Sequence, residues 1–182
     1  MPLTGHVGDT NWKTWNGGSN LEDTTDMQHQ ESKIQQACVT WFRYQYPHLA
    51  FLLFHPKNEG HGDRIAGAIA KAEGVVPGVP DLILAIPSVY HCMLCLEMKT
   101  PRGRQSDSQR RYQAYAETAT AEYHIIRDVN TFQDVVMQYL SQVPTNLLQR
   151  LHDLHCSLEQ ADMLRNKARL HKLLKNGNNQ SR

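Results

Sequence analysis

Hydrophobic residues recur along the first third of this chain at the spacing of a helix that buries one side. Apolar residues at every third or fourth position from Ile34 to Trp41 predict a helix over about residues 25–46. Two capping-box patterns fit its start, one at Thr25 and one at Ser32. Glu31 is therefore expected either inside this helix or just before it.

The apolar runs that follow are short and are separated by glycine and proline. They predict a buried strand at 50–54, a helix at 63–73, strands at 82–86 and 91–99, a helix at 106–118, a strand at 123–127 and a helix at 132–140. The link at 87–90 is short, which favours antiparallel pairing of the two strands that it joins. This order of elements indicates a layered α/β protein.

The last forty residues predict one long helix over 145–175, in which leucines alternate in steps of four and three from Leu147 to Leu158. Such a seam packs more often on its own domain than on a partner. Six basic and no acidic residues follow from Met163 to Arg182. We therefore divide the chain into a polar arm (1–25), a folded domain (26–142) and a helical extension with a basic end (143–182).

Composition narrows the class of protein further. A chain of 182 residues with 40% hydrophobic content can bury one core, and 19 basic against 18 acidic side chains neither require nor exclude a nucleic-acid partner. No apolar run is long enough to span a bilayer or to act as an export signal, so we expect a cytoplasmic protein without a membrane partner. Cys92 and Cys95 fall on opposite faces of a predicted strand, which argues against a metal shared between them.

Asp81, Glu97 and Lys99 carry the strongest chemical pattern. Side chains two apart in a strand share a face, so Glu97 and Lys99 project together while Met98 points into the packing. Antiparallel pairing places Asp81, at the head of one strand, near the tail of the next, where Glu97 lies. Two carboxylates and an ammonium then meet at one end of a sheet, which suits a hard cation, and the carbonyl of Met98 is a further candidate ligand.

Hydrolysis of a phosphodiester needs such a centre, because a bound Mg²⁺ neutralises the phosphate and helps to generate hydroxide, while a lysine orients the attacking water. The alternative is a cross-strand ion pair, since an E-x-K triplet alone occurs by chance in many strands. Further motifs in the chain help to decide between a metal centre and a simple ion pair.

Six segments extend the pattern in order along the chain: Glu31 to Gln35 ahead of Trp41, Pro56 to Arg64, Gly78 to Leu82, Leu96 to Thr100, Gly103 to Gln109, and the strand ending at Arg127. Together they resemble the VRR-NUC (virus-type replication-repair nuclease) branch of the PD-(D/E)XK nucleases. The resemblance covers about residues 30–140. It implies an α/β fold with a PD-(D/E)XK (restriction-endonuclease-like) core, a mixed central sheet flanked by helices, and here also a long C-terminal helix.

The resemblance also implies roles for five side chains. Asp81 and Glu97 would ligate Mg²⁺ or Mn²⁺, and Lys99 would assist the nucleophile. Glu31 would add an acid from the first helix, although a favourable charge near a helix N-terminus explains this residue about as well. Gln109 would help to place the lysine or the water. The implied metal ligands are thus Glu31, Asp81, Glu97 and the carbonyl of Met98.

The family further implies a DNA endonuclease that is selective for structures such as flaps or four-way junctions, and that acts as a homodimer. Five arginines are candidate phosphate contacts, four by their position near the active-site strand and Arg64 by its match to the family: Arg64, Arg102, Arg104, Arg110 and Arg111. The competing hypothesis is a nucleic-acid-binding module that kept the fold and lost catalysis, against which the intact Asp81, Glu97 and Lys99 argue. A surface helix explains His152, His155 and Cys156 better than a zinc site does.

Overall fold

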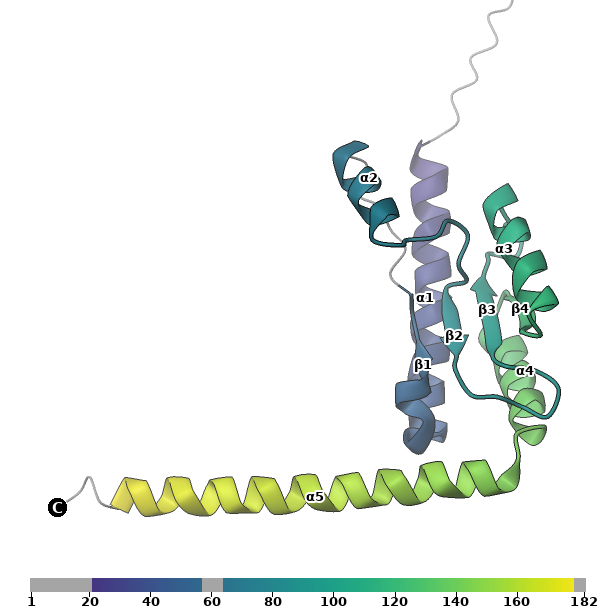
Figure 1. Ribbon diagram of the computed structural model, residues 1–182. Helices are drawn as coiled ribbons and strands as arrows, with labels where there is room; N and C mark the ends of the chain where they lie inside the picture. The colour runs from purple at the N-terminus through teal and green to yellow at the C-terminus, as the bar shows by residue number, and fades with distance from the viewer. Residues whose placement is uncertain (1–20, 57–63, 179–182) are drawn as a thin grey trace, which may run out of the picture.

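The computed structural model describes residues 21–56 and 64–178, and within them the side chains of residues 27–56 and 67–170. The elements are α1 (Leu21–Gln45), the 3-10 helix η1 (Pro47–Leu52), β1 (Leu53–Phe54), α2 (Arg64–Ala72), β2 (Leu82–Leu84), β3 (Leu94–Met98), α3 (Asp107–Thr118), β4 (Glu122–Ile126), α4 (Val129–Ser141) and α5 (Thr145–Asn178). Figure 1 shows helices packed around one small sheet, with α5 running away from it. The expected α/β class, with a mixed sheet, flanking helices and a long C-terminal helix, is confirmed.

The strands of the described residues lie in the order β1-β2-β3-β4. β2 is antiparallel to both β1 and β3, whereas β4 is parallel to β3. In the central pair Leu82 lies opposite Leu96, so the start of β2 adjoins the end of β3, as predicted. The parallel pair needs a crossover connection, which α3 supplies.

One face of the sheet carries the main hydrophobic core. Leu94, Leu96 and Met98 alternate along β3 and have no exposed surface. They pack with side chains of α1 and α4, such as Phe42 and Phe132. The core therefore fixes α1 and α4 on this face.

The opposite face of the sheet is covered by α3. Cys95 of β3 forms a smaller cluster there with Tyr123 of β4 and Ala116 of α3. Because side chains alternate along a strand, Glu97 and Lys99 fall on this same side of β3. The chemical residues thus lie towards α3, away from the main core.

Two glycines with positive φ shape the loop between α2 and β2, and the second of them approaches α3. Gly74, at φ 94°, ends α2, as expected. Gly78 has φ 86°, and a Cβ atom there would lie 2.3 Å from the backbone C and O atoms of Ser108. Only glycine allows this close approach, which holds the loop three residues before Asp81.

The expected buried strand at 50–54 is wrong for most of its length. Pro47 stands in the first turn of η1, where its fixed φ suits a helical turn, and η1 continues to Leu52. Only Leu53 and Phe54 pair with β2. Phe51 is 92% exposed, so the apolar run does not mark a buried strand.

Helix boundaries differ less from the predictions. α1 begins at Leu21, before either capping-box candidate, which places Glu31 well inside the helix. Residues 21–25 of the predicted arm are therefore helical, and residues 1–20 lie outside the described residues. Strands β2 and β3 are shorter than expected at their outer ends, because pairing stops at Leu84 and Leu94.

The long helix α5 belongs to the domain only at its start. Leu147 and Leu151, the first two leucines of the predicted seam, pack against the main core, as does Leu148. Leu154 and Leu158 are about half exposed, at 55% and 50%. None of the helices, over the ranges described above, is long and apolar enough to cross a bilayer.

Candidate active site

The start of β2 and the end of β3 bring Asp81 and Met98 into direct contact. The backbone N–H of Met98 donates to Asp81 Oδ2 at 2.7 Å. This bond places the Asp81 carboxylate beside Met98, which lies between Glu97 and Lys99 in the chain. The convergence expected from strand pairing is therefore present in the structure.

Glu97 is a carboxylate with no exposed surface, and three side chains surround it. Lys99 Nζ donates to its Oε1 at 2.5 Å, and Gln109 Nε2 donates to the same oxygen. Tyr123 Oη donates to Oε2 at 3.4 Å. The carboxylate is thus held in one orientation by β3, β4 and α3.

The protonation of the two acids is shifted in the same direction. Burial raises the pKa of Glu97 to about 7, the nearby Asp81 carboxylate adds to this shift, and Lys99 opposes it. Burial likewise raises the pKa of Asp81, against the lowering effect of the Met98 N–H and of Lys99. Both acids therefore favour the neutral form more than exposed carboxylates do, and a nearby cation would reverse that preference.

Glu31 reaches the centre from α1, which lies alongside the sheet (Figure 1). Its Oε1 accepts the backbone N–H of Thr100 at 3.1 Å, and its Oε2 lies 4.0 Å from Lys99 Nζ. A Cβ atom on Gly103 would come within 3.2 Å of the same carboxylate. Glu31 therefore lies at the edge of the centre and anchors the chain that leaves β3.

Gln109 joins the N-terminus of α3 to Glu97. Its Oε1 accepts the Ser106 N–H at 2.8 Å, while Ser106 Oγ accepts the Gln109 N–H at 3.2 Å, which is a complete capping box. This bond orients the side-chain amide so that its NH₂ group faces Glu97. One side chain thus caps the helix and contacts the centre.

The oxygen atoms around Lys99 fit a hard cation. Its ammonium lies 2.5 Å from Glu97 Oε1, 3.0 Å from the Met98 carbonyl oxygen and 4.0 Å from Glu31 Oε2. Carboxylate and carbonyl oxygens are the ligands that Mg²⁺ prefers. Within the described side chains no three His, Cys, Asp or Glu residues are arranged to hold an ion together. Because only two carboxylates, Asp81 and Glu97, meet at the end of β3, a metal ion here would need the Met98 carbonyl as a third ligand, with Glu31 at the edge.

Four of the candidate phosphate-binding arginines have described side chains, and these lie on two segments, the chain that leaves β3 and α3. Arg102 and Arg104 are exposed on the chain that leaves β3. Arg110 forms an ion pair with Asp107 and donates to the carbonyl of Gln105 at 2.6 Å. Arg111 lines a separate cavity, described below. The side chain of Arg64, the first residue of α2, lies outside the described residues.

The sequence analysis assigned no role to three residues that support the site. Arg127 Nη1 donates to the carbonyls of Thr100 and Gly103, the latter at 3.0 Å, and so braces the exit of β3. His55 Nδ1 lies 2.6 Å from the backbone oxygen of Asp81. Tyr123 contacts Glu97 from β4. Arg127 ended a segment of the family pattern, but no sequence signal pointed to His55 or Tyr123.

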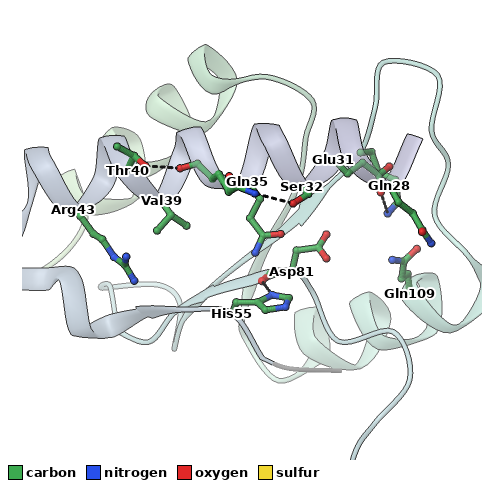
Figure 2. A pocket seen from close by; sticks show the side chains of 12 residues that line it. Gln28, Glu31, Ser32, Gln35, Val39, Thr40, Arg43, His55, Asp81 and Gln109 are labelled. Atoms are coloured by element: carbon green, nitrogen blue, oxygen red, sulfur yellow. Dashed lines mark hydrogen bonds and ion pairs between the residues drawn. The ribbon is translucent and has the colours of Figure 1, made fainter. Parts of the chain in front are cut away.

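A cleft of about 740 Å³ opens beside the centre and follows α1. Figure 2 shows its lining, with Asp81, His55 and Gln109 on one side and polar side chains of α1 on the other. Arg43 lines the far part of the cleft, twelve residues or about 18 Å of helix from Glu31. The cleft therefore runs along α1 towards Asp81 and Lys99.

The mixed α/β fold, with Pro80-Asp81 beside the end of a strand that carries Glu97 and Lys99, defines a protein of the PD-(D/E)XK class. Residues 19–127 match the family model of the VRR-NUC domain. A solved structure of a "VRR_NUC domain protein" is 19% identical, with a TM-score of 0.55, over 63% of this chain and 90% of that one. No curated protein sequence matches.

The family model covers more than half of the chain, so the chain belongs to the VRR-NUC family. The resemblance noted in the sequence is thereby confirmed. The domain is of nuclease type, and its family indicates a nucleic acid as substrate.

Proposed function

We propose that this protein is a Mg²⁺- or Mn²⁺-dependent DNA endonuclease whose centre is formed by Asp81, Glu97 and Lys99. The observation that carries the proposal is the bond from the Met98 N–H to Asp81, because it gathers both carboxylates and the lysine at one point. The buried position of Glu97 supports it as well: burial raises the pKa of this acid although Lys99 lies 2.5 Å away, and a metal ion beside it would further stabilise its charged form.

Each side chain has a distinct task in this proposal. Asp81, Glu97 and the Met98 carbonyl would hold the metal ion, with Glu31 as a more distant acid. A bound Mg²⁺ supplies charge neutralisation at the scissile phosphate and lowers the pKa of the attacking water. Lys99 orients that water or offsets the negative charge that develops on the phosphate. Gln109 holds the Glu97 carboxylate in place.

The family and the cleft both support a nucleic-acid substrate. Away from Glu31, Asp81 and Lys99, the cleft along α1 is lined mainly by neutral polar side chains and by Arg43, which suits contacts to a nucleic-acid backbone. Flaps or four-way junctions are the proposed DNA structures. A homodimer would supply a second centre for the second strand, because one centre cuts one strand.

A cleavage assay tests the proposal. Purified protein is incubated with a blunt duplex, a flapped duplex and a four-way junction, each with Mg²⁺, Mn²⁺ or EDTA. Cleavage is expected with either metal ion and not with EDTA. Asp81→Asn keeps an oxygen for the Met98 N–H but removes the charge, so the rate should fall by more than about 100-fold. Asp134→Asn, on the exposed side of α4, is the matched control and should cut normally.

Two results would contradict the proposal. Undiminished cutting by Asp81→Asn would show that the centre lies elsewhere. Tight DNA binding by the wild-type protein without cleavage on any substrate or metal ion would favour the catalytically silent binding module.

A further inference from the structure

A second cavity, of about 640 Å³, lies between the loop before β2 and α3. Val76 and Pro77 line it from the loop, and Arg111, Tyr112 and Tyr115 line it from α3. Its walls are largely apolar, and its volume falls within the roughly 300–1,000 Å³ of typical small-molecule sites. The hydrolytic reaction proposed above uses none of these side chains.

The cavity adjoins the active-site cleft through the first turn of α3. Ser108 lines the cavity and also lines a smaller one, of about 180 Å³, which reaches Asp81 and Gln109. Gly78 makes its close approach to the same residue, Ser108. The contact between Gly78 and Ser108 therefore contributes to the walls of both cavities. A DNA strand bound at the Asp81 centre would pass close to the larger cavity.

The side chains of the cavity suit a flat aromatic ligand. Tyr112 packs against the smaller core cluster, which fixes its ring, whereas Tyr115 is 68% exposed. Arg111 is exposed beside them, and a guanidinium stacks on aromatic rings or pairs with phosphate. The Asp107 carboxylate also lines the cavity, but Arg110 neutralises it in an ion pair. A neutral aromatic ring linked to a phosphate would match these tyrosines and Arg111.

We propose that this cavity binds an unpaired nucleobase of the DNA strand that is cut at the Asp81 centre. The inference rests on the proposed function and names a feature of its substrate. Tyr115 lies six residues beyond Gln109, or about 9 Å along the helix. Stacked nucleotides rise about 3.4 Å each, so a base bound here belongs to a nucleotide within a few positions of the cut phosphate. A base inside a duplex cannot enter a pocket, so the substrate must present an unpaired or extruded base there.

The test compares the DNA affinity of four full-length proteins in EDTA, where no cutting occurs. They are the wild type, Tyr115→Ala, Tyr115→Phe and Tyr90→Ala. Tyr90 is a matched control because it is 72% exposed and lies in the link at the opposite end of the β2-β3 pair. Fluorescence anisotropy is measured with a flapped duplex and with a blunt duplex of equal length, and melting temperatures show that each variant is folded.

Loss of stacking on one base should weaken binding of the flapped duplex by Tyr115→Ala by about fivefold or more. Binding of the blunt duplex should not change, and Tyr115→Phe and Tyr90→Ala should resemble the wild type. Unchanged affinity of Tyr115→Ala for the flap would overturn the inference and leave the cavity to a protein ligand. An equal loss on both substrates would overturn it too, because that pattern indicates a backbone contact.

Cleavage of the same two substrates with Mg²⁺ separates this inference from the proposed function. Cutting by the wild type, together with a flap affinity that does not depend on Tyr115, would overturn the base site alone. Failure of the wild type to cut either substrate, with a flap affinity that does depend on Tyr115, would overturn the nuclease proposal and retain the cavity as a base-binding site.

Discussion

The Glu97 carboxyl group is completely buried beside a lysine, a glutamine and a tyrosine. Its pKa is raised from 4.5 to about 7, chiefly by burial and then by Asp81. Between these two values the folded, metal-free protein keeps a proton that the unfolded chain has released. The contribution of this proton to stability is therefore fully present below pH 4.5 and is lost as the pH rises to about 7.

Stability should accordingly depend on pH through Glu97. In EDTA, the free energy of unfolding of the wild type, relative to Glu97→Gln, should fall between about pH 4.5 and pH 7, because Gln does not titrate. Urea denaturation at several pH values measures this difference. Since metal ligands must be deprotonated, the rise in melting temperature on adding Mg²⁺ should grow as the pH passes through about 7.

The comparison with Glu97→Gln removes the effects of the other acids, which titrate in both proteins. A difference between the two proteins that stays constant with pH would show that Glu97 is already ionised in the metal-free fold. Equal stabilisation by Mg²⁺ at pH 5 and pH 8 would contradict its role as a ligand.

Single residues of the site were predictable where backbone periodicity determines them. Glu97 and Lys99 share a face because they are two apart in a strand, and Asp81 adjoins them because its strand is antiparallel to theirs. His55 and Tyr123 depend on how β1 and β4 pack beside that pair, and no local pattern encodes this packing. Gln109 was found only through the family pattern, because a helix glutamine has no distinctive periodicity.

At the scale of elements, the N-terminus of α3 links helix formation to the centre. Its capping box uses Ser106 and Gln109, and the same Gln109 amide contacts Glu97. α4 also begins with a side-chain cap, since Asp128 accepts the Thr131 N–H at 2.8 Å. The Asp128 carboxylate bonds to Thr131 within α4 itself, so the two caps can be compared.

Loss of the α3 cap should cost about 1 kcal/mol of stability, and loss of the α4 cap should lower stability as well. Ser106→Ala should also slow cleavage, because the first turn of α3 no longer holds Gln109 in register with Glu97. Asp128→Ala should cause a loss of stability with an unchanged cleavage rate. Chemical denaturation and initial cleavage rates measure both effects, and equal activity in the two variants would argue against a positioning role for the α3 cap.

Helix boundaries were predicted most accurately where the local sequence carries a start or stop signal. α3 has a capping box, and α2 has a glycine stop, so both lie close to their predicted ranges. The 50–54 run was assigned to a strand by its apolar residues alone, yet Pro47 and the pairing limits of β2 make most of it η1. Short apolar runs do not distinguish a strand from a helical turn when tertiary pairing decides.

The long helix α5 connects the nuclease domain to an exposed helical surface. Its first turns complete the main core, together with Val143 just before it. Beyond them Leu154, Leu158 and Leu164 are half exposed or more. In the homodimer proposed above, a second copy of the chain would cover this exposed apolar surface of α5.

Two truncations should therefore behave differently. Ending the chain after Leu140 removes the buried Val143 and the partly buried Leu147 and Leu151 from the core, and a fully buried aliphatic side chain contributes about 2–5 kcal/mol. Since small domains are stable by only about 5–15 kcal/mol, this variant should be clearly destabilised. Ending it after Ser157 keeps these contacts, so the protein should stay folded and elute as a monomer. Light scattering with gel filtration measures both, and a persistent dimer would place the interface elsewhere.

The most direct test of the active-site assignment is the Mg²⁺-dependent cleavage rate of Glu97→Gln at pH 8, measured beside Glu159→Gln on the exposed side of α5. Gln keeps the shape of the side chain and an oxygen for Lys99 and Gln109, but it removes the buried charge. The rate should fall by more than about 100-fold in Glu97→Gln while the control cuts like the wild type. A Glu97→Gln protein that cuts DNA at the wild-type rate would contradict the assignment of this centre.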